Sequence, residues 1–195
     1  MAASSAHEER DKYLARHRNT VDEYHRMGEA GVLPENARLE LLEGELIDMA
    51  PIGPAHANTV DHLVTRFAPF TGSVILRVQN PLRLGSRSEL LPDLMLLTKR
   101  PGGYPDAAPV PQDVLLLIEV SDASVGYDRE HKLKLYAEHG IVEAWLLDLN
   151  ARQLEIHLEP STQGYRRLLK PAPDAVVAPT RIEAIRFQAG TVFPG

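Results

Sequence analysis

Hydrophobic and polar residues follow one another along this chain with two periods, one typical of strands and one typical of helices. Two short apolar runs stand out, LMLL directly after Asp93 and VLLLI directly before Glu119. Runs of this length, bounded by turn residues, are typical of buried strands. Apolar residues at helical spacing predict a helix from about Ala55 to Phe67. A second helix is expected from about Asp128 to Glu138.

Turn signals divide the rest of the chain into hairpins and one short capped helix. Thr20 and Glu23 form the capping-box pattern that marks a helix start. Hairpins are expected over residues 38–49, turning at 43–44, and over residues 144–158, turning at 150–152. Further strands are expected at residues 73–78, with residues 82–84 extending that strand beyond a bulge, and at residues 165–169.

This order of strands with two main helices predicts an α/β or α+β fold. The 195 residues are enough for one domain with a sizeable core. We expect that domain to cover residues 20–195, preceded by a polar N-terminal arm at residues 1–19. A Pro/Gly-rich loop at residues 98–113 joins the two acid-bearing strands.

The two acids next to the apolar runs call for a common explanation. A carboxylate buried without a partner is costly. If the two strands pair antiparallel, the start of one lies beside the end of the other, so Asp93 and Glu119 meet at one edge of the sheet. Two carboxylates that close repel each other unless they share a proton or a cation. A hard divalent cation such as Mg²⁺ or Mn²⁺ is the simplest solution.

Composition excludes several classes of site. The chain has no cysteine, which excludes disulfides, thiolate zinc sites and cysteine nucleophiles, and it is compatible with a reducing cytoplasm. The N-terminal residues have no apolar core of a secretory signal, and no apolar run is long enough to predict a membrane span. The net charge of −6 argues against a surface coated with basic residues for nucleic acid, but leaves room for a local basic cleft.

Such a cleft is suggested by a local excess of basic residues around the first acid strand. Between residues 77 and 100, two acids, Glu89 and Asp93, stand against five basic residues: Arg77, Arg83, Arg87, Lys99 and Arg100. A carboxylate site rimmed by arginines would suit a phosphate backbone. The alternative is that this excess is only a modest local enrichment.

An ordered set of short motifs resembles a known family. PD at residues 92–93, EVS at 119–121, YDREHKLKLY at 127–136 and WLLD at 145–148 are similar to the Uma-type family of restriction-endonuclease-like proteins, in the PD-(D/E)XK nuclease superfamily. LELLEGEL at 39–46 and VQNPLRLG at 78–85 extend the resemblance. It implies a central mixed β-sheet flanked by helices.

The resemblance also implies roles for particular residues. Asp93 and Glu119 would be catalytic metal ligands, with the Val120 carbonyl as a third ligand. The superfamily lysine expected two residues after the glutamate is Ser121 here. In Uma-type members the lysine comes from the following helix, and the matching residue is Lys132. Because residues 132 and 134 diverge by about 200° on an α-helix, Lys134 should then face solvent.

Three more residues are candidate accessory groups, each with a structural alternative. Gln79 could orient a ligand or simply end a strand. Glu40 could add a carboxylate to the site, although glutamates in hairpins are usually exposed. His56 could act in catalysis, but packing or capping at the start of its helix is the more ordinary role. We interpret Tyr127 and Tyr136 as packing residues.

The function expected from this set is a Mg²⁺- or Mn²⁺-dependent endonuclease that hydrolyses phosphodiester bonds in DNA, working in the cytoplasm. A two-fold homodimer would match the symmetry of duplex DNA. The alternative is a non-catalytic module that binds nucleic acid or protein on the same fold, because a fold alone does not establish an activity.

Overall fold

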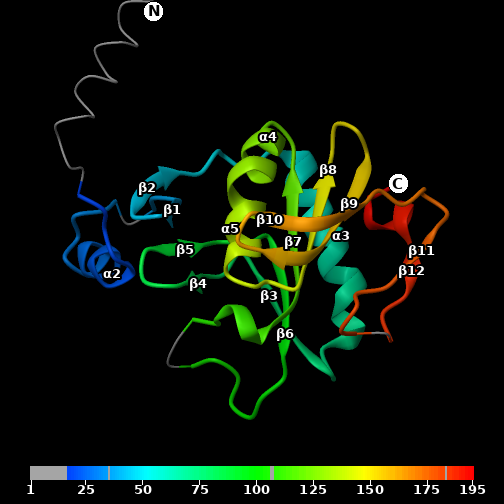
Figure 1. Ribbon diagram of the computed structural model, residues 1–195, viewed down its shortest axis with the longest axis horizontal. Helices are drawn as coiled ribbons and strands as arrows, with labels where there is room; N and C mark the ends of the chain where they lie inside the picture. The colour runs from blue at the N-terminus through cyan, green and yellow to red at the C-terminus, as the bar shows by residue number, and fades with distance from the viewer. Residues whose placement is uncertain (1–16, 35, 106–107, 183) are drawn as a thin grey trace, which may run out of the picture.

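The computed structural model describes residues 17–34, 36–105, 108–182 and 184–195. Most of the expected N-terminal arm therefore lies outside the described residues. The element order agrees with the α/β or α+β class expected from the sequence (Figure 1). Among the residues that the structure describes, no helix combines the length and apolar character that crossing a membrane requires.

A six-stranded sheet forms the centre of the protein. In spatial order its strands are β10 (Gly164–Leu169), β9 (Gln153–Ser161), β8 (Glu143–Asp148), β7 (Val114–Ser121), β6 (Leu94–Thr98) and β3 (Val74–Val78). Neighbouring strands are antiparallel except β7 and β8, which are parallel. The sheet is therefore mixed, as predicted, and its parallel pair needs a crossover connection.

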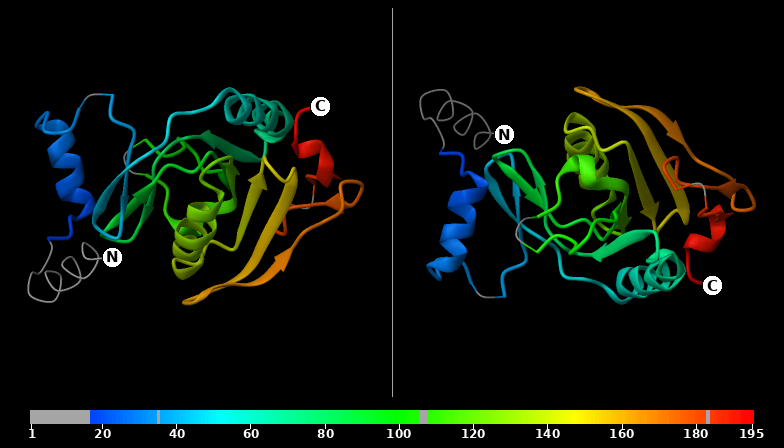
Figure 2. Two further views of the ribbon diagram at one scale, coloured as in Figure 1. Left: turned by 90° about the horizontal axis from the view of Figure 1, so that it is seen from above. Right: turned by 90° about the horizontal axis from the view of Figure 1, so that it is seen from below.

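Helices cover both faces of this sheet. Helix α3 (Pro54–Phe67) lies on one face, and the crossover between β7 and β8 lies on the other (Figure 2). The crossover consists of α4 (Val125–Tyr127), a π-helix (Asp128–Lys132) and α5 (Leu133–Glu138). The sequence predicted one regular α-helix over residues 128–138, so the π-helical turn is a correction to that prediction.

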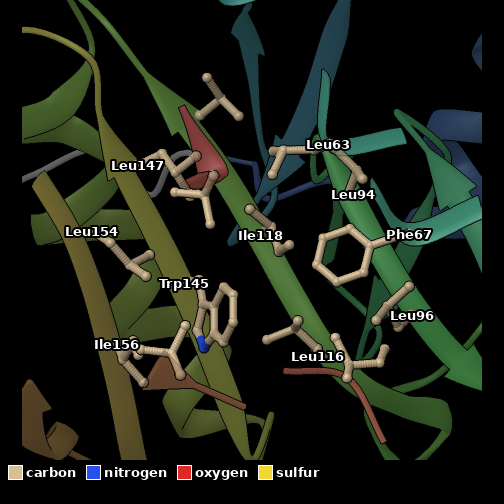
Figure 3. Close-up of a cluster of buried hydrophobic side chains, with 14 of the residues drawn as sticks. Leu63, Phe67, Leu94, Leu96, Leu116, Ile118, Trp145, Leu147, Leu154 and Ile156 are labelled. Atoms are coloured by element: carbon tan, nitrogen blue, oxygen red, sulfur yellow. The ribbon is translucent and has the colours of Figure 1, made fainter. Parts of the chain in front are cut away.

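Side chains alternate between the two faces of each strand and so build two cores. On the α3 face, Phe67 packs with alternate residues of three strands, among them Leu96, Ile118 and Trp145 (Figure 3). On the crossover face, the intervening strand residues pack with Leu133, Leu135, Tyr136 and Ala137 of α5. Both faces of the central strands are buried, which explains their continuous apolar runs.

A second sheet of four antiparallel strands lies beside the first. Its strands, in spatial order, are β2 (Glu45–Asp48), β1 (Leu39–Leu42), β5 (Ser88–Leu90) and β4 (Leu82–Leu84). The expected extension of the 73–78 strand through residues 82–84 is therefore wrong, because β4 turns back and pairs with β5. Helix α2 (Val21–Glu29) packs at the outer end of this sheet and begins with the predicted capping box.

The C-terminal segment closes the α3 face of the large sheet. It contains a two-stranded ribbon, β11 (Val176–Val177) with β12 (Phe187–Gln188). The buried Glu143 carboxylate of β8 anchors this segment by accepting hydrogen bonds from Thr180 N and Oγ1, each at 2.7 Å, and it also accepts one from Trp145 Nε1 at 2.6 Å. Short 3₁₀ turns lie at Ala68–Phe70, Pro111–Asp113 and Ala189–Val192.

Candidate active site

The register of β6 and β7 brings the two acids together. Leu94 pairs with Ile118 in the antiparallel ladder, so the next positions outward are Asp93 and Glu119. Residues two apart on a strand share a face, so Asp93 lies on the same face as Met95, and Glu119 lies on the same face as Leu117. Both acid side chains therefore lie on the crossover face of the sheet. Both residues are buried, at 6% and 3% exposed. The predicted pairing of the acid-bearing strands is thus observed.

Hydrogen-bond donors surround the Asp93 carboxylate. Its Oδ2 contacts His56 Nε2 at 3.1 Å and accepts a bond from the Val120 backbone N–H at 2.9 Å. Its Oδ1 accepts a bond from Gln79 Nε2 at 3.0 Å. Burial raises the pKa of Asp93, but these bonds outweigh it and hold that pKa below its usual 3.8. The hydrogen bond with Asp93 raises the pKa of His56 above its usual 6.5.

The Glu119 carboxylate is held from the crossover helix. Tyr136 Oη donates a hydrogen bond to Glu119 Oε1 at 2.6 Å, and Lys132 Nζ lies 3.4 Å from the same oxygen. Burial raises the pKa of Glu119 well above its usual 4.5, the Lys132 ammonium lowers it, and the carboxylate of Asp93 raises it further. A further cation close to Glu119 would therefore stabilise the charged form of its carboxylate.

Lys132 joins the two sheets at this point. It is 5% exposed, and its ammonium lies 2.9 Å from Glu40 Oε1 in addition to its contact with Glu119. Burial lowers the pKa of Lys132, but the carboxylates of Glu119 and Glu40 outweigh burial and raise it. The Lys134 side chain, by contrast, is 58% exposed and lies 3.7 Å from Glu138. The two lysines point to opposite environments, as expected.

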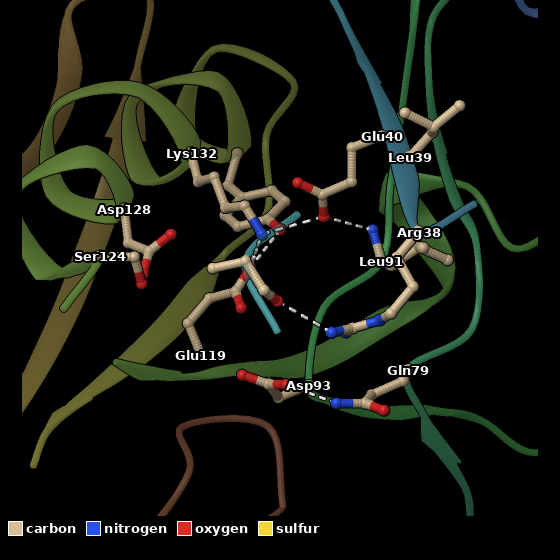
Figure 4. Close-up of polar contacts among 12 residues, drawn as sticks. Arg38, Leu39, Glu40, Gln79, Leu91, Asp93, Glu119, Ser124, Asp128 and Lys132 are labelled. Carbon is tan, nitrogen blue, oxygen red and sulfur yellow. Dashed lines mark hydrogen bonds and ion pairs between the residues drawn. The ribbon is translucent and has the colours of Figure 1, made fainter. Parts of the chain in front are cut away.

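Glu40 is buried, contrary to the usual exposure of hairpin glutamates. It is 2% exposed, and its Oε1 accepts a hydrogen bond from the Leu91 backbone N–H at 2.9 Å as well as from Lys132. Leu91 precedes Asp93 by two residues and Lys132 contacts Glu119, so Glu40 links the segment before Asp93 to the lysine of the site. Figure 4 shows the side chains of Glu40, Glu119 and Lys132 pointing toward one another from β1, β7 and the π-helix.

Asp128 occupies the first position of the π-helix. Its Oδ2 accepts hydrogen bonds from the hydroxyls of Ser121 and Ser124, the latter at 2.8 Å. Ser121, which stands where the superfamily pattern has a lysine, therefore fixes a fourth buried carboxylate. π-Helical turns are rare and frequently occur at functional sites. This one places Asp128 and Lys132 on the side of the helix that faces the acids.

A cavity of about 380 Å³ lies between the crossover helix, the β1–β2 hairpin and the loop before α3, and the groups above that line it are Glu40, His56, Asp93, Glu119, Ser124, Asp128 and Lys132. Of the residues that line this cavity, Arg38 and Lys132 are cationic at neutral pH, and His56 is also part of the lining. Six acids line the same cavity: Glu40, Asp48, Asp93, Glu119, Asp122 and Asp128. The cavity is therefore strongly acidic.

The basic residues expected to rim the site lie elsewhere. None of the five cations between residues 77 and 100 lines the cavity. Arg83 pairs with Asp22 at 3.0 Å, Arg100 stacks on the Tyr104 ring, and Lys99 donates to the carbonyl of Gly72. The expectation of an arginine rim is therefore wrong, because proximity in sequence to the first acid strand does not place these side chains at its Asp93 end.

The residues present suit a hard cation only in part. Across the described portion of the chain, no three His, Cys, Asp or Glu side chains are grouped as a preformed metal site. Asp93 and Glu119 supply two carboxylates, and a backbone carbonyl is the third donor type that Mg²⁺ and Ca²⁺ accept. Val120 N–H faces Asp93, whereas the Ser121 carbonyl accepts from Leu149 N on the β8 side. The Val120 carbonyl therefore points to the Asp93 side, as a third ligand requires.

Two residues of the site were not identified as functional from the sequence. Tyr136 is fully buried, and its hydroxyl holds Glu119, although its apolar neighbours indicated a packing residue. Asp128 was interpreted only as the start of a helix. The signal that could have identified Tyr136 is its separation of four residues from Lys132, since residues at that spacing lie on one helix face.

Replacing Tyr136 by Phe is expected to lower the free energy of unfolding by about 1.5–3 kcal/mol at neutral pH, because it removes a hydrogen bond to a buried charged group. Tyr127→Phe is the matched control, since the Tyr127 hydroxyl is buried without a hydrogen-bond partner among the described residues. Urea denaturation of both variants measures the difference. Equal losses in the two variants would show that the Tyr136 hydroxyl does not support Glu119.

Comparison with known proteins gives a family and a fold. The model of the Uma2 family, described as "Putative restriction endonuclease", matches residues 21–189. A crystal structure from Anabaena variabilis, described as "a putative nuclease belonging to DUF820", superposes with a TM-score of 0.63 at 17% sequence identity, covering 90% of this chain and 97% of the other. Comparison with curated proteins gives no significant match.

Proposed function

The chain belongs to the Uma2 family of restriction-endonuclease-like proteins, and from that premise we propose that it is a Mg²⁺- or Mn²⁺-dependent nuclease that hydrolyses phosphodiester bonds in DNA. The observation that carries the proposal is the convergence of Asp93, Glu119 and Lys132 in one cavity. These are two carboxylates on adjacent strands and a lysine that lies 3.4 Å from one of them. The wider shape of the sheet agrees with that of a nuclease-like fold.

Asp93, Glu119 and the Val120 carbonyl are the residues that would hold the cation. A bound divalent cation would polarise the phosphoryl group and lower the pKa of an attacking water. Three of the four carboxylate oxygens already have hydrogen-bonding partners: Asp93 Oδ2 contacts His56 and the Val120 N–H, Asp93 Oδ1 accepts from Gln79, and Glu119 Oε1 accepts from Tyr136. The second Glu119 oxygen has no hydrogen-bond donor among the described residues, so it is available to a cation.

Lys132 supplies a buried positive charge at this site. Its ammonium would stabilise negative charge that develops on the phosphate oxygens, or position the attacking water, as preorganised donors do in other sites. Glu40 fixes the ammonium at 2.9 Å. We assign Glu40, Gln79 and His56 to positioning: Glu40 acts on Lys132, and Gln79 and His56 act on Asp93.

A plasmid-nicking assay tests this function. Purified protein with Mg²⁺ or Mn²⁺ should convert supercoiled plasmid to the nicked form, and Asp93→Asn should abolish the conversion. Mn²⁺ should also raise the melting temperature of the wild type and not of Asp93→Asn, because a ligand that binds only the folded state stabilises it. Lys134→Ala is the control for general surface effects, since Lys134 is exposed.

The alternative function is a non-catalytic module that binds nucleic acid or protein. It is favoured by the net charge of −6 and by the pairing of Lys132 with two carboxylates, which leaves it less free for substrate. Wild-type protein that neither nicks plasmid nor responds to Mn²⁺ would support this alternative and contradict the nuclease proposal.

A further inference from the structure

We infer that the site accepts nucleic acid as an unpaired nucleotide, in a single strand or at an unpaired end, rather than as continuous duplex. The inference names the substrate class of the proposed nuclease and therefore rests on that proposal. Three observations support it: the burial of the acids, the apolar wall of the cavity, and the scarcity of cations around it.

Burial of the reactive groups limits what can reach them. Asp93, Glu119 and Lys132 are each at most 6% exposed. They line a cavity of about 380 Å³, which is within the range of pockets that enclose one small molecule. In a duplex the phosphates lie along a continuous stack of paired bases that cannot enter such a pocket. An unpaired nucleotide can enter it, with its phosphate toward the acids.

The cavity wall offers an apolar surface for the base. Ile47 at the β2 strand and Met49, Pro51 and Ile52 in the loop before α3 line the cavity together with the acids. Ile52 is one of the exposed large apolar residues of the described chain, at 41% exposed. The face of an unstacked base is largely apolar, and an apolar wall can remove it from water, whereas the bases of a duplex are already stacked. A polar or charged wall would be expected if only phosphates were bound.

The charge around the cavity limits how many phosphates can be bound there. Duplex-binding proteins commonly neutralise several phosphates with Lys and Arg, whereas six acids line this cavity and Lys132 is already paired with two of them. Arg38 is the remaining Arg or Lys at the cavity, and it donates to the Ala50 carbonyl at 3.0 Å. With Lys132 and Arg38 both engaged by the protein, few phosphate contacts are expected.

The test compares one labelled oligonucleotide in three forms with Mn²⁺: single strand, blunt duplex, and duplex with an unpaired 3′ tail. Single strand and tail should be cleaved at least about tenfold faster than the paired region, because unpairing and unstacking reduce duplex binding. The logarithm of affinity for the single strand should fall with the logarithm of salt at a slope of about −1, the value for one or two phosphate contacts.

A substitution in the wall provides a second measurement. Ile52→Ser should raise KM for the single strand several-fold with little change in kcat, since it removes binding shared by ground and transition states. Val32→Ser is the matched control, because Val32 is 67% exposed and does not line the cavity.

The outcomes separate this inference from the function on which it rests. Equal rates on single strand and duplex, abolished by Asp93→Asn, would overturn the inference and leave the nuclease intact. A salt slope of about −4 or steeper would also overturn it, because it would indicate six or more phosphate contacts. Cleavage of no substrate, or cleavage that persists in Asp93→Asn, would remove both proposals.

Discussion

Replacing Lys132 by Met should lower the free energy of unfolding by about 3–5 kcal/mol at neutral pH and abolish nicking. The ammonium is buried between Glu40 and Glu119, and removing one member of a buried ionic cluster leaves the others without a counter-charge. Methionine keeps much of the apolar stem, so the loss reports the charge rather than a cavity. Chemical denaturation measures the stability, and plasmid conversion with Mn²⁺ measures the activity.

The pH dependence of this variant identifies the cause of its instability. Burial raises the pKa of Glu119, so the folded state binds a proton more readily than the unfolded state, and stability falls as pH rises from 4.5 through the raised pKa. Lys132 opposes that rise in pKa, so removing it should steepen the loss of stability with increasing pH. The deficit of Lys132→Met should therefore shrink as pH is lowered.

Two controls accompany the Lys132 experiment. Lys134→Met should change stability by no more than about 0.5 kcal/mol, because Lys134 is exposed. Adding Glu119→Gln to Lys132→Met should recover part of the loss, since the two residues are in contact and their effects are not additive. A Lys132→Met protein as stable as the wild type at neutral pH would refute the buried cluster.

Replacing Arg129 by Met is expected to cost about 1.5–3 kcal/mol at neutral pH, for a reason independent of the Lys132 cluster. Arg129 binds Glu155 through Nε at 3.0 Å and Nη2 at 2.9 Å, and it binds Asp148 at 2.8 Å. The Glu155 side chain is only 1% exposed, and the more exposed Lys170 would be its remaining cation, at 2.7 Å. The Arg129 side chain is itself 37% exposed, so solvent screens part of the attraction, but its removal leaves the buried Glu155 carboxylate with fewer donors.

The deficit of this variant also shrinks as pH is lowered, but at lower pH than that of the Lys132 variant, because the pKa of Glu155 is lowered whereas that of Glu119 is raised. Burial raises the pKa of Glu155, but its bonds with Arg129 and Lys170 outweigh burial and hold that pKa below its usual 4.5. The contribution of a carboxylate with a lowered pKa is present above the unfolded pKa and is lost as pH falls through the folded pKa. The difference between wild type and Arg129→Met should therefore be full at neutral pH and vanish in acid.

Arg166→Met is the matched control for Arg129, because Arg166 lies on the exposed surface of β10. It should leave urea midpoints within experimental scatter of the wild type. Arg129→Met should also reduce nicking, since Arg129 ties the π-helix that carries Lys132 to strands β8 and β9. Unchanged denaturation of Arg129→Met at neutral pH would show that its contacts with Glu155 and Asp148 are energetically neutral.

The strand pairing and the acid pair could be predicted because they depend on local pattern. Apolar runs bounded by turn residues located β6 and β7, and antiparallel pairing then placed Asp93 beside Glu119. The capping box of α2 and the hairpin of β8 and β9 are also set by residues close in sequence. The choice of Lys132 over Lys134 needed the family resemblance as well as helix geometry.

The partners of these residues could not be predicted, because they come from distant segments. Glu40 reaches Lys132 across 92 positions, and only the packing of the second sheet brings them together. Strand β5 has three residues and carries no periodic signal, so that sheet was missed. The prediction of an arginine rim was wrong for the same reason, because a count of charges along the sequence does not say which end of a strand each side chain reaches.

The π-helix makes the length of the β7–β8 crossover part of the site. A π-helical turn bonds residues five apart, so it holds one residue more than the α-helical turn that it replaces. Loss of one residue between Asp128 and Lys132 would return the segment to a regular α-helix, with better backbone hydrogen bonding, and would rotate the lysine by about 100° relative to the acids. Insertions and deletions are usually harmless in connections between strands. In this crossover, a single deletion would make the helix more regular and would turn Lys132 away from the acids.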